Sequence, residues 1–318
     1  MADGLRANDA PPPDRAVRDR PRPAAEPRYD APGVDLLQPG HLACPGCAAP
    51  ILMRTFLRLA GPRTVLCIPA SCYAVIDGPF PYSSSGVNVV HCAFETAAVT
   101  AAGVKAGLRA RGEDVLVVAW AGDGGTFDIG LQAMSAAAER NEDILYVCYD
   151  NEAYMNTGIQ RSGATPALAW TSNTAGGKIG RKKDLGGIMA AHRIPYFATA
   201  SPGFPEDMAA KMERAIRTRG FRMVHALSPC PPGWRMDERS TLAAARLAVE
   251  TGVFPLYEVE DGTAWRETVR PSRRPVSEYL ALQGRFGALG EGAIAAIQAG
   301  VDADAALLAQ RFRGTVEG

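Results

Sequence analysis

Short apolar runs alternate along this chain with segments whose apolar positions recur at helical spacing. Residues 115–120 and 144–149 are apolar and rich in β-branched or aromatic side chains, so they predict buried strands. Residues 127–139, between them, have the spacing of a helix. A strand, a helix and a second strand of these lengths predict a β-loop-α-β unit with parallel strands.

The same patterns continue through the chain and predict an α/β fold. We expect a doubly wound, mainly parallel sheet with helices on both faces. Further strands are predicted over residues 64–69, 196–200, 222–227 and 254–259. Further helices are predicted over residues 49–59, 184–191, 205–218 and 242–250, with an alanine-rich helix that ends near Arg111.

Polar and glycine residues follow both strands of the central unit. The sequence Gly122-Asp123-Gly124-Gly125 comes after the first strand, and residues 150–158 follow the second. Ligands of open α/β sheets bind at the carboxyl ends of the strands, and glycine lets the backbone approach a ligand closely. Asp123, the Asn151 amide and backbone carbonyls just after it offer hard oxygen ligands. This set suits Mg²⁺ holding a diphosphate.

Four cysteines occupy loops at element ends. Cys44 and Cys47 form a C-x-x-C pair, Cys72 follows the strand predicted over residues 64–69, and Cys230 follows the strand over residues 222–227. A C-x-x-C pair alone fits a redox dithiol, half of a zinc site or half of an iron–sulfur site. Four thiolates brought together would select zinc or an iron–sulfur cluster. We interpret the other three as buried small hydrophobes: Cys67, Cys92 and Cys148.

The segments GDGGTFDIGLQAMSAAAER and YDNEAYMNTGIQRS resemble the β subunit of pyruvate:ferredoxin oxidoreductase and its 2-oxoacid relatives. The resemblance covers roughly residues 41–286 and implies the thiamine diphosphate-binding fold. It implies that Mg²⁺ is held by Asp123, Asn151 and the Ala153 carbonyl, and that Asn156 lies beside the reacting carbon. Cofactor contacts are also implied for Gly122, Gly124, Gly125 and Thr157. A [4Fe–4S] cluster is implied on Cys44, Cys47, Cys72 and Cys230.

The resemblance also implies a reaction and its partners. The reaction is coenzyme A-dependent oxidative decarboxylation of a 2-oxoacid, with electrons passed through the cluster to ferredoxin. Pyruvate is the expected substrate, with 2-oxoisovalerate, oxalate and phenylglyoxylate as alternatives. No motif-matched carboxylate for the aminopyrimidine of the cofactor is found here, so an α subunit is expected to supply it. Ferredoxin-like γ and δ subunits are expected as well.

The amino-acid composition limits the kinds of partner and the cellular compartment to be expected. The 34 basic and 34 acidic residues cancel, which favours neither nucleic acid nor an anionic membrane as a partner. No apolar run approaches the roughly 20 residues that span a bilayer. Seven cysteines without a secretory signal favour a reducing compartment, and we expect a cytoplasmic protein. Residues 1–38 are rich in proline and charge and predict an extended arm, followed by a catalytic domain over 39–262 and a helical extension over 263–318.

Two other interpretations remain open at this stage. A non-redox thiamine diphosphate decarboxylase or synthase subunit would share the glycine turn without needing four cysteines. A zinc-stabilised interaction subunit would use the cysteines and have no chemistry of its own. Residues 160–187 predict a long polar loop, which is usually functional or an interface. Its run Arg181-Lys182-Lys183 predicts a solvated face or an attraction for an anionic substrate or an acidic partner.

Overall fold

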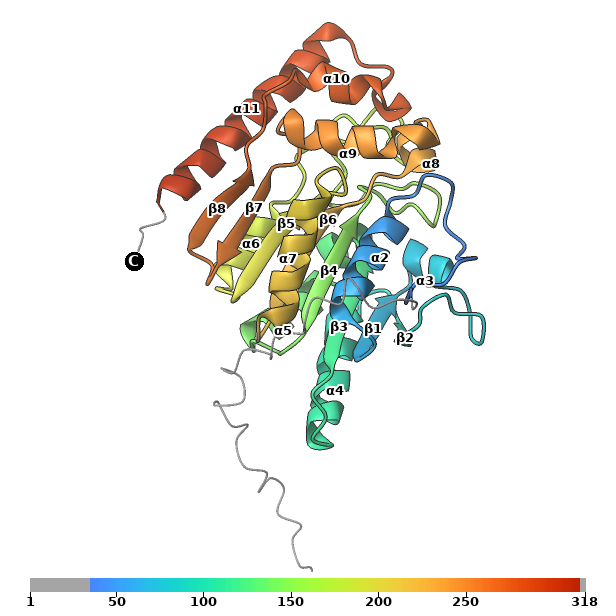
Figure 1. Cartoon of the computed structure of the whole chain (residues 1–318). Helices are drawn as coiled ribbons and strands as arrows, with labels where there is room; N and C mark the ends of the chain where they lie inside the picture. Colours follow the sequence, from blue (N-terminus) through green and yellow to red (C-terminus); the bar gives the residue numbers. More distant parts are fainter. Residues whose placement is uncertain (1–34, 315–318) are drawn as a thin grey trace, which may run out of the picture.

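The computed structural model describes residues 35–314 and contains one eight-stranded sheet (Figure 1). The strand order is β2-β1-β3-β4-β6-β5-β7-β8. The first six strands in this order run parallel, and β7 and β8 are antiparallel at one edge. This confirms the predicted α/β class. The bounds are β1 Thr64–Pro69, β2 Asn88–Cys92, β3 Leu116–Gly122, β4 Leu145–Asp150, β5 Tyr196–Ala200, β6 Arg222–Leu227, β7 Leu256–Glu260 and β8 Ala264–Val269.

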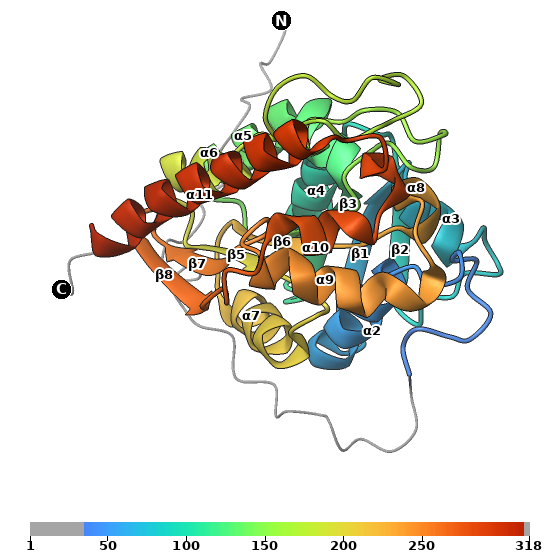
Figure 2. The same ribbon diagram turned by 90° about the horizontal axis from the view of Figure 1, so that it is seen from above.

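Helices cover both faces of the sheet, as Figure 2 shows from above. One face carries α2 (Ala49–Ala60) and α7 (Pro205–Arg217); the other carries α4 (Ala97–Ala110), α5 (Leu131–Glu139) and α6 (Leu185–Ala191). Strand β3 shows why its sequence is uniformly apolar. Its residues alternate between the two hydrophobic cores, with Trp120 in one and Ala119 in the other. All seven residues are therefore buried, as is typical of a central parallel strand.

Agreement with the predicted elements is best where both faces of a strand are buried. The strands predicted over residues 64–69, 196–200 and 222–227 are confirmed with those bounds. The edge strands β2 and β8 were not predicted, because their residues are partly exposed and form no apolar run. The start of the predicted helix over residues 127–139 was wrong. A π-helical turn, η2 (Gly124–Asp128), comes first, and α5 begins at Leu131.

The C-terminal part of the chain lies above the carboxyl ends of the parallel strands and beside the sheet (Figure 1). It comprises α8 (Pro231–Trp234), η3 (Glu238–Ser240), α9 (Thr241–Glu250), α10 (Val276–Ala281), η4 (Gly284–Phe286) and α11 (Glu291–Arg313). The sheet continues through β8, past the domain boundary expected at residue 262. On the N-terminal side, residues 1–34 of the expected arm lie outside the described residues.

Helix α11 is long and apolar enough, by length and composition alone, to cross a membrane. This helix does not contradict the sequence-based expectation that no apolar run approaches the length of a span, because Gln298, Asp302 and Asp304 interrupt its apolar residues. These two criteria are weak evidence for a span. In the structure one side of α11 packs on the protein through Ile294, Ile297 and Val301, and the guanidinium of Arg311 lies 4.6 Å from the ring centre of Trp265. The helix behaves here as the outermost layer of the domain.

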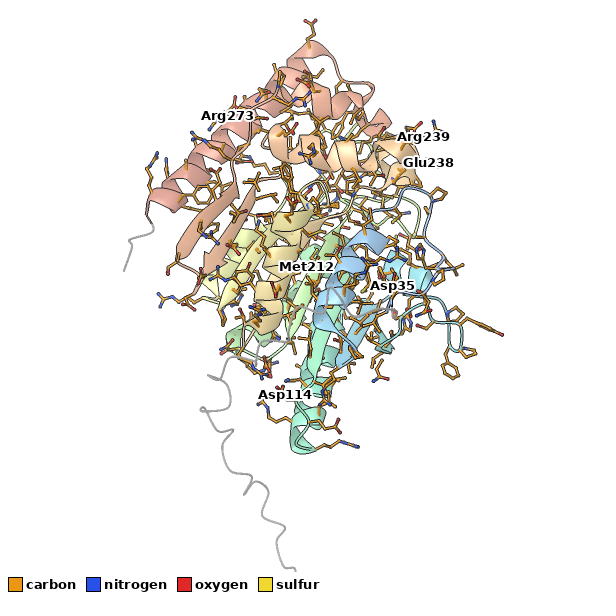
Figure 3. All side chains as sticks on the ribbon, viewed as in Figure 1. Asp35, Asp114, Met212, Glu238, Arg239 and Arg273 are labelled. Carbon is orange, nitrogen blue, oxygen red and sulfur yellow. The ribbon has the colours of Figure 1, made fainter. Side chains whose placement is uncertain are left out.

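A cluster of buried charges closes the amino end of the sheet. The Asp143 carboxylate, just before β4, lies within ion-pair distance of three cations: Arg222 at 2.7 Å, Arg219 at 3.1 Å and Lys105 at 3.1 Å. Arg219 also binds Asp114, which Figure 3 shows at the opposite end of the molecule from Glu238 and Arg239. The cluster fixes the starts of β3, β4 and β6, and it therefore helps to position the carboxyl ends of these strands.

We expect Asp143→Ala to lower the free energy of unfolding by about 3–5 kcal/mol, because it removes one partner of a buried ion-pair network. Urea unfolding followed by circular dichroism measures this loss. Glu139→Ala, at an exposed position of α5, is the control and should change stability by no more than about 0.5 kcal/mol. Equal effects of the two substitutions would contradict the assignment of Asp143 as the organising charge.

Candidate functional site

The glycine-rich turn begins where β3 ends. Gly122 is the last residue of the strand, and Asp123 precedes the π-helical turn η2. The Thr126 hydroxyl donates a hydrogen bond to the Gly122 carbonyl at 2.8 Å, which closes the turn. All residues from Gly122 to Phe127 are buried. Single π-helical turns occur frequently at functional sites, and this one fixes Asp123 at the carboxyl edge of the sheet.

Three polar groups that the sequence analysis singled out lie close together beside this turn. The Asn151 side chain is placed with its amide oxygen 2.9 Å from Asp123 Oδ1 and 2.9 Å from the Ala153 carbonyl oxygen. Oxygens this close repel each other unless something joins them. The amide can turn over, so that its NH₂ group donates to both, or a cation can bind all three. Hard oxygen donors of this kind are the set that Mg²⁺ takes, so the residues fit the predicted metal.

Ser162 holds the other oxygen of Asp123. Its hydroxyl donates to Asp123 Oδ2 at 2.5 Å, which leaves Oδ1 facing Asn151. Burial, aided by the neighbouring Asp150 carboxylate, raises the pKa of Asp123 well above its ordinary value. A bound cation would offset this effect, because it favours the ionised carboxylate. Sequence reasoning missed Ser162, which lies 39 residues further along the chain and carries no motif.

Buried ion pairs support the loop that follows β4. Lys182 Nζ lies 2.5 Å from Asp150 Oδ2 and 3.1 Å from Glu152 Oε1. His225 Nε2 lies 2.7 Å from the same Asp150 oxygen. Lys182 and His225 together outweigh burial and lower the pKa of Asp150 to about 2. The expectation that the basic run faces solvent or attracts a partner is wrong for Lys182, because its charge is neutralised internally.

The predicted long loop is real, but its middle is not solvated. Between β4 and α6 the described chain contains no helix or strand, yet residues 162–165 are all buried. Lys178, which is 3% exposed, donates to the Thr165 carbonyl at 2.5 Å. The loop therefore packs under the Asp123 site and supplies Ser162 from inside the protein.

Asn156 and Thr157 lie further along the same loop, at an exposed tip. A bridge between Tyr154 and Gln160 closes the base of the tip, and the Thr157 hydroxyl donates to Gln160 Oε1 at 2.6 Å. The Tyr154 hydroxyl donates to Asp128 Oδ2 at 2.6 Å, so the tip is anchored to the π-helical turn. The structure thus brings Asp123, Asn151 and Ala153 together and sets Asn156 and Thr157 at the surface above them.

The four predicted cysteine ligands lie on three loops that contact one another. The Ala48 amide donates to the Pro229 carbonyl at 3.4 Å, and this joins the C-x-x-C loop to the Cys230 loop. Burial, together with the neighbouring thiols of Cys230, Cys47 and Cys44, raises the pKa of Cys72 to about 12. Asp123 also contributes to this shift, so the Cys72 thiol lies within electrostatic range of the oxygen site.

The turn between the first two cysteines requires glycine. Gly46 has φ +71°, and a Cβ there would lie 2.4 Å from the Glu238 carbonyl oxygen. The Gly46 carbonyl accepts a hydrogen bond from the Thr241 hydroxyl at 2.5 Å. Helix α9 therefore fixes the C-x-x-C loop from above.

The remaining cysteines differ from one another. Cys67 and Cys148 are fully buried in the core, as predicted. The prediction was wrong for Cys92, which ends the edge strand β2 and is partly exposed. Among residues 35–314, no three His, Cys, Asp or Glu side chains form a group that could hold one metal ion.

Comparison with known proteins first defines the class. Residues 70–226 match the family "Thiamine pyrophosphate enzyme, C-terminal TPP binding domain", a range that includes the glycine turn and the Asn151 loop. Among solved structures, the fold is similar to a 2-oxoglutarate:ferredoxin oxidoreductase from Magnetococcus marinus. The TM-score is 0.53 at 23% identity, over 64% of this chain and 76% of that one. The protein therefore has the thiamine diphosphate-binding fold.

Curated relatives then define the family. The chain is 49% identical over 260 residues to ketoisovalerate oxidoreductase subunit VorB of Pyrococcus abyssi, covering 78% of this chain and 84% of the relative. It is 49% identical over 278 residues to pyruvate synthase subunit PorB of Methanothermobacter thermautotrophicus, covering 85% and 96%. The PorB of Methanocaldococcus jannaschii is 46% identical over 291 residues, covering 87% and 97%. The chain belongs to the family of 2-oxoacid:ferredoxin oxidoreductase β subunits.

Two glycines give a matched test of the site's packing. A Cβ on Gly124 would lie 2.0 Å from the Tyr154 ring, so Gly124→Ala must displace Tyr154 and should cost about 1–3 kcal/mol of stability. A Cβ on Gly107, inside α4, meets nothing within 4 Å, so Gly107→Ala should stabilise the helix by up to about 1 kcal/mol. Thermal unfolding of the two variants measures both signs. A neutral Gly124→Ala would show that Tyr154 does not pack on the turn.

Proposed function

We propose that this chain is the β subunit of a 2-oxoacid:ferredoxin oxidoreductase that makes acetyl-coenzyme A from pyruvate. The proposed reaction removes the carboxyl group of the 2-oxoacid as CO₂, passes two electrons to ferredoxin and transfers the acyl group to coenzyme A. The observation that carries this proposal is that the Cys72 thiol lies within electrostatic range both of the oxygen site at Asp123 and of the Cys230, Cys47 and Cys44 thiols. An oxygen-ligated diphosphate site beside a one-electron acceptor is what such chemistry requires.

The oxygen site is assigned to Mg²⁺ and thiamine diphosphate. Asp123, Asn151 and the Ala153 carbonyl would hold the metal, which in turn binds the diphosphate. Gly122, Gly124 and Gly125 would contact the cofactor through their backbone, because protein residues occupy the space that their side chains would fill. Thiamine diphosphate, when bound, supplies the carbon nucleophile that attacks the ketone of the 2-oxoacid. The Asn156 amide is assigned a hydrogen bond to the reacting group, and Thr157 a contact to the cofactor from the same loop tip.

The thiol site is assigned to a [4Fe–4S] cluster on Cys44, Cys47, Cys72 and Cys230. Burial raises the pKa of Cys47 to about 11 and that of Cys230 to about 12, so these groups are thiols at neutral pH. Thiolates are the ligands of iron–sulfur clusters, and cluster insertion would therefore release protons. The oxidoreductase names of the relatives favour this cluster over a structural zinc ion and over a non-redox decarboxylase.

Partner subunits complete the proposed site. The loop tip that carries Asn156 is exposed in this chain, which suits a surface that a second subunit covers. We assign the aminopyrimidine carboxylate and the substrate-binding residues to an α subunit, and onward electron transfer to ferredoxin-like γ and δ subunits and to ferredoxin in the cytoplasm. Ketoisovalerate is the second candidate substrate, because a VorB relative is as similar to this chain as a PorB relative.

A panel of 2-oxoacids tests the proposed reaction. The complex with its partner subunits should reduce a viologen dye when given pyruvate and coenzyme A, and less rapidly with 2-oxoisovalerate, oxalate or phenylglyoxylate. The isolated chain should show no 2-oxoacid-dependent reduction, because its site is shared. Full turnover by the isolated chain would contradict the shared site, and a complex that reacts with none of these acids would contradict the proposed function.

Cys230→Ser tests the cluster assignment. The substitution replaces a soft thiolate with a hard, poorly ionised hydroxyl, so it should lose or convert one [4Fe–4S] cluster and abolish electron delivery to the dye. Iron and sulfide analysis with low-temperature electron paramagnetic resonance measures the change. Cys92→Ser is the matched control, since Cys92 is also partly exposed but stands outside the four. One mole of zinc and no iron in anaerobically purified wild-type chain would instead support the zinc interpretation.

A further inference from the structure

Glu152 occupies an unusual position between the two proposed metal-binding residues of the loop. It has φ +70°, a left-handed conformation that is uncommon for a residue with a side chain, and it is 2% exposed. All four of its hydrogen-bonding groups are held. Its amide donates to Asp150 Oδ1 at 2.9 Å, and its carbonyl accepts from the Thr165 hydroxyl at 2.6 Å. Its carboxylate binds Lys182 Nζ at 3.1 Å and Arg285 Nη2 at 2.5 Å.

Arg285 reaches this loop from a distant part of the sequence, 133 residues away. It belongs to η4 near the C-terminus and is 3% exposed. Its Nε donates to Gln283 Oε1 at 2.9 Å, and its carbonyl accepts from the Trp170 amide at 2.9 Å. Both ends of the residue are therefore fixed, and its guanidinium has a defined direction.

Arg285 also contacts the other side of the metal loop through Trp234. The guanidinium lies 4.0 Å from the Trp234 ring centre, within range of a cation–π interaction. The Trp234 indole N–H donates to the Asn151 carbonyl at 2.8 Å. Arg285 thus contacts Glu152 directly, and it supports Asn151 through the ring of Trp234.

These contacts explain how the loop keeps its shape. A non-glycine residue in the left-handed region persists only where its surroundings hold it there, at a cost of about 1–3 kcal/mol. A buried carboxylate that lost its guanidinium would keep only Lys182 as a cationic partner and would be disfavoured as well. Without Arg285, both effects favour rotation of the Glu152 backbone. That rotation would separate the Asn151 and Ala153 oxygens on either side of it.

We propose that Arg285 is a positioning residue that holds the metal-binding loop in its ligating conformation through Glu152. This inference rests on the proposed function, because it concerns the same Mg²⁺ site. It assigns the C-terminal segment around η4 a part in cofactor binding, although Arg285 touches neither the metal nor the cofactor itself.

The experiment compares Arg285→Gln with wild type in the full complex with its partner subunits. Thiamine diphosphate is titrated at several Mg²⁺ concentrations, and tryptophan fluorescence is followed because Trp234 contacts both Arg285 and Asn151. The Mg²⁺ concentration for half-saturation should rise about 10- to 100-fold, as is typical when a residue that orients a metal ligand is lost. An unchanged half-saturation would overturn the proposal.

Three further variants separate positioning from general destabilisation. Arg274→Gln is the matched control, because Arg274 also pairs with glutamates in the C-terminal part but at the exposed surface, and it should leave the titration unchanged. Arg285→Lys keeps the charge without the planar fork and should restore only part of the Mg²⁺ affinity. Should Arg285→Gln fail to fold, Arg285→Lys carries the same test, and wild-type Mg²⁺ affinity in it would overturn the proposal. Asp123→Ala, which removes a ligand itself, sets the weakest binding expected.

A double-mutant cycle with Glu152→Gln tests the route through Glu152. If Arg285 acts through this residue, Glu152→Gln and Arg285→Gln should be non-additive in Mg²⁺ affinity. Strictly additive losses would overturn the route. The two failures are distinguishable, because a wild-type complex that binds no thiamine diphosphate in a Mg²⁺-dependent way contradicts the proposed function. A wild type that binds normally beside an unchanged Arg285→Gln contradicts only the positioning role.

Discussion

The convergence of the Asn151 side chain with the Asp123 carboxylate and the Ala153 carbonyl is the constraint on which the rest of this site depends. The Asn151 amide lies within hydrogen-bonding distance of both Asp123 Oδ1 and the Ala153 carbonyl, and all three residues are buried. Burial, aided by the neighbouring Asp150 carboxylate, raises the pKa of Asp123 well above its ordinary value. The fold compensates on every side, with a hydroxyl from Ser162 on Asp123 and a held conformation at Glu152. Such an arrangement is poised to bind a cation.

The two ends of the parallel strands have different roles: the amino ends contribute to stability, and the carboxyl ends carry the candidate site. At the amino ends, Asp143 gathers cations that fix the starts of three strands. At the carboxyl ends, the same strands deliver Asp123 and the Asn151 loop, and β6 leads to Cys230. Packed protein interiors are stiff, so strands that are fixed at their amino ends also have fixed positions at their carboxyl ends. The carboxyl ends of the strands can therefore tolerate a buried carboxylate with a raised pKa, at Asp123, and a left-handed backbone conformation, at Glu152.

The sequence predicted the features that depend on neighbouring residues, and it missed the contacts between distant parts of the chain. Strands β1, β5 and β6 were predicted with their observed bounds, because burial on both faces makes the sequence of each mostly apolar. Asp123 and Asn151 could be singled out as candidates because each directly follows a strand. The contact of Arg285 with Glu152 spans 133 residues and exists only once η4 is folded over the sheet, so no local pattern signals it. Lys182 was misjudged for the same reason, since its carboxylate partners lie about thirty residues earlier.

The similarity to relatives named for different 2-oxoacids bears on where specificity resides. The pyruvate synthase subunit and the ketoisovalerate oxidoreductase subunit are each 49% identical to this chain, although the two acids differ in the bulk of their side chains. Under the proposed function, holding the metal and transferring electrons are steps that do not sense that bulk. The Asp123 site and the four cysteines are proposed to serve those steps, and Asp123 lies on elements that the core fixes. The exposed tip around Asn156, by contrast, faces the place assigned to a partner subunit. Under the proposed function, substrate discrimination is therefore assigned to the surface that the partner would complete, and the cofactor chemistry to the buried edge of this sheet.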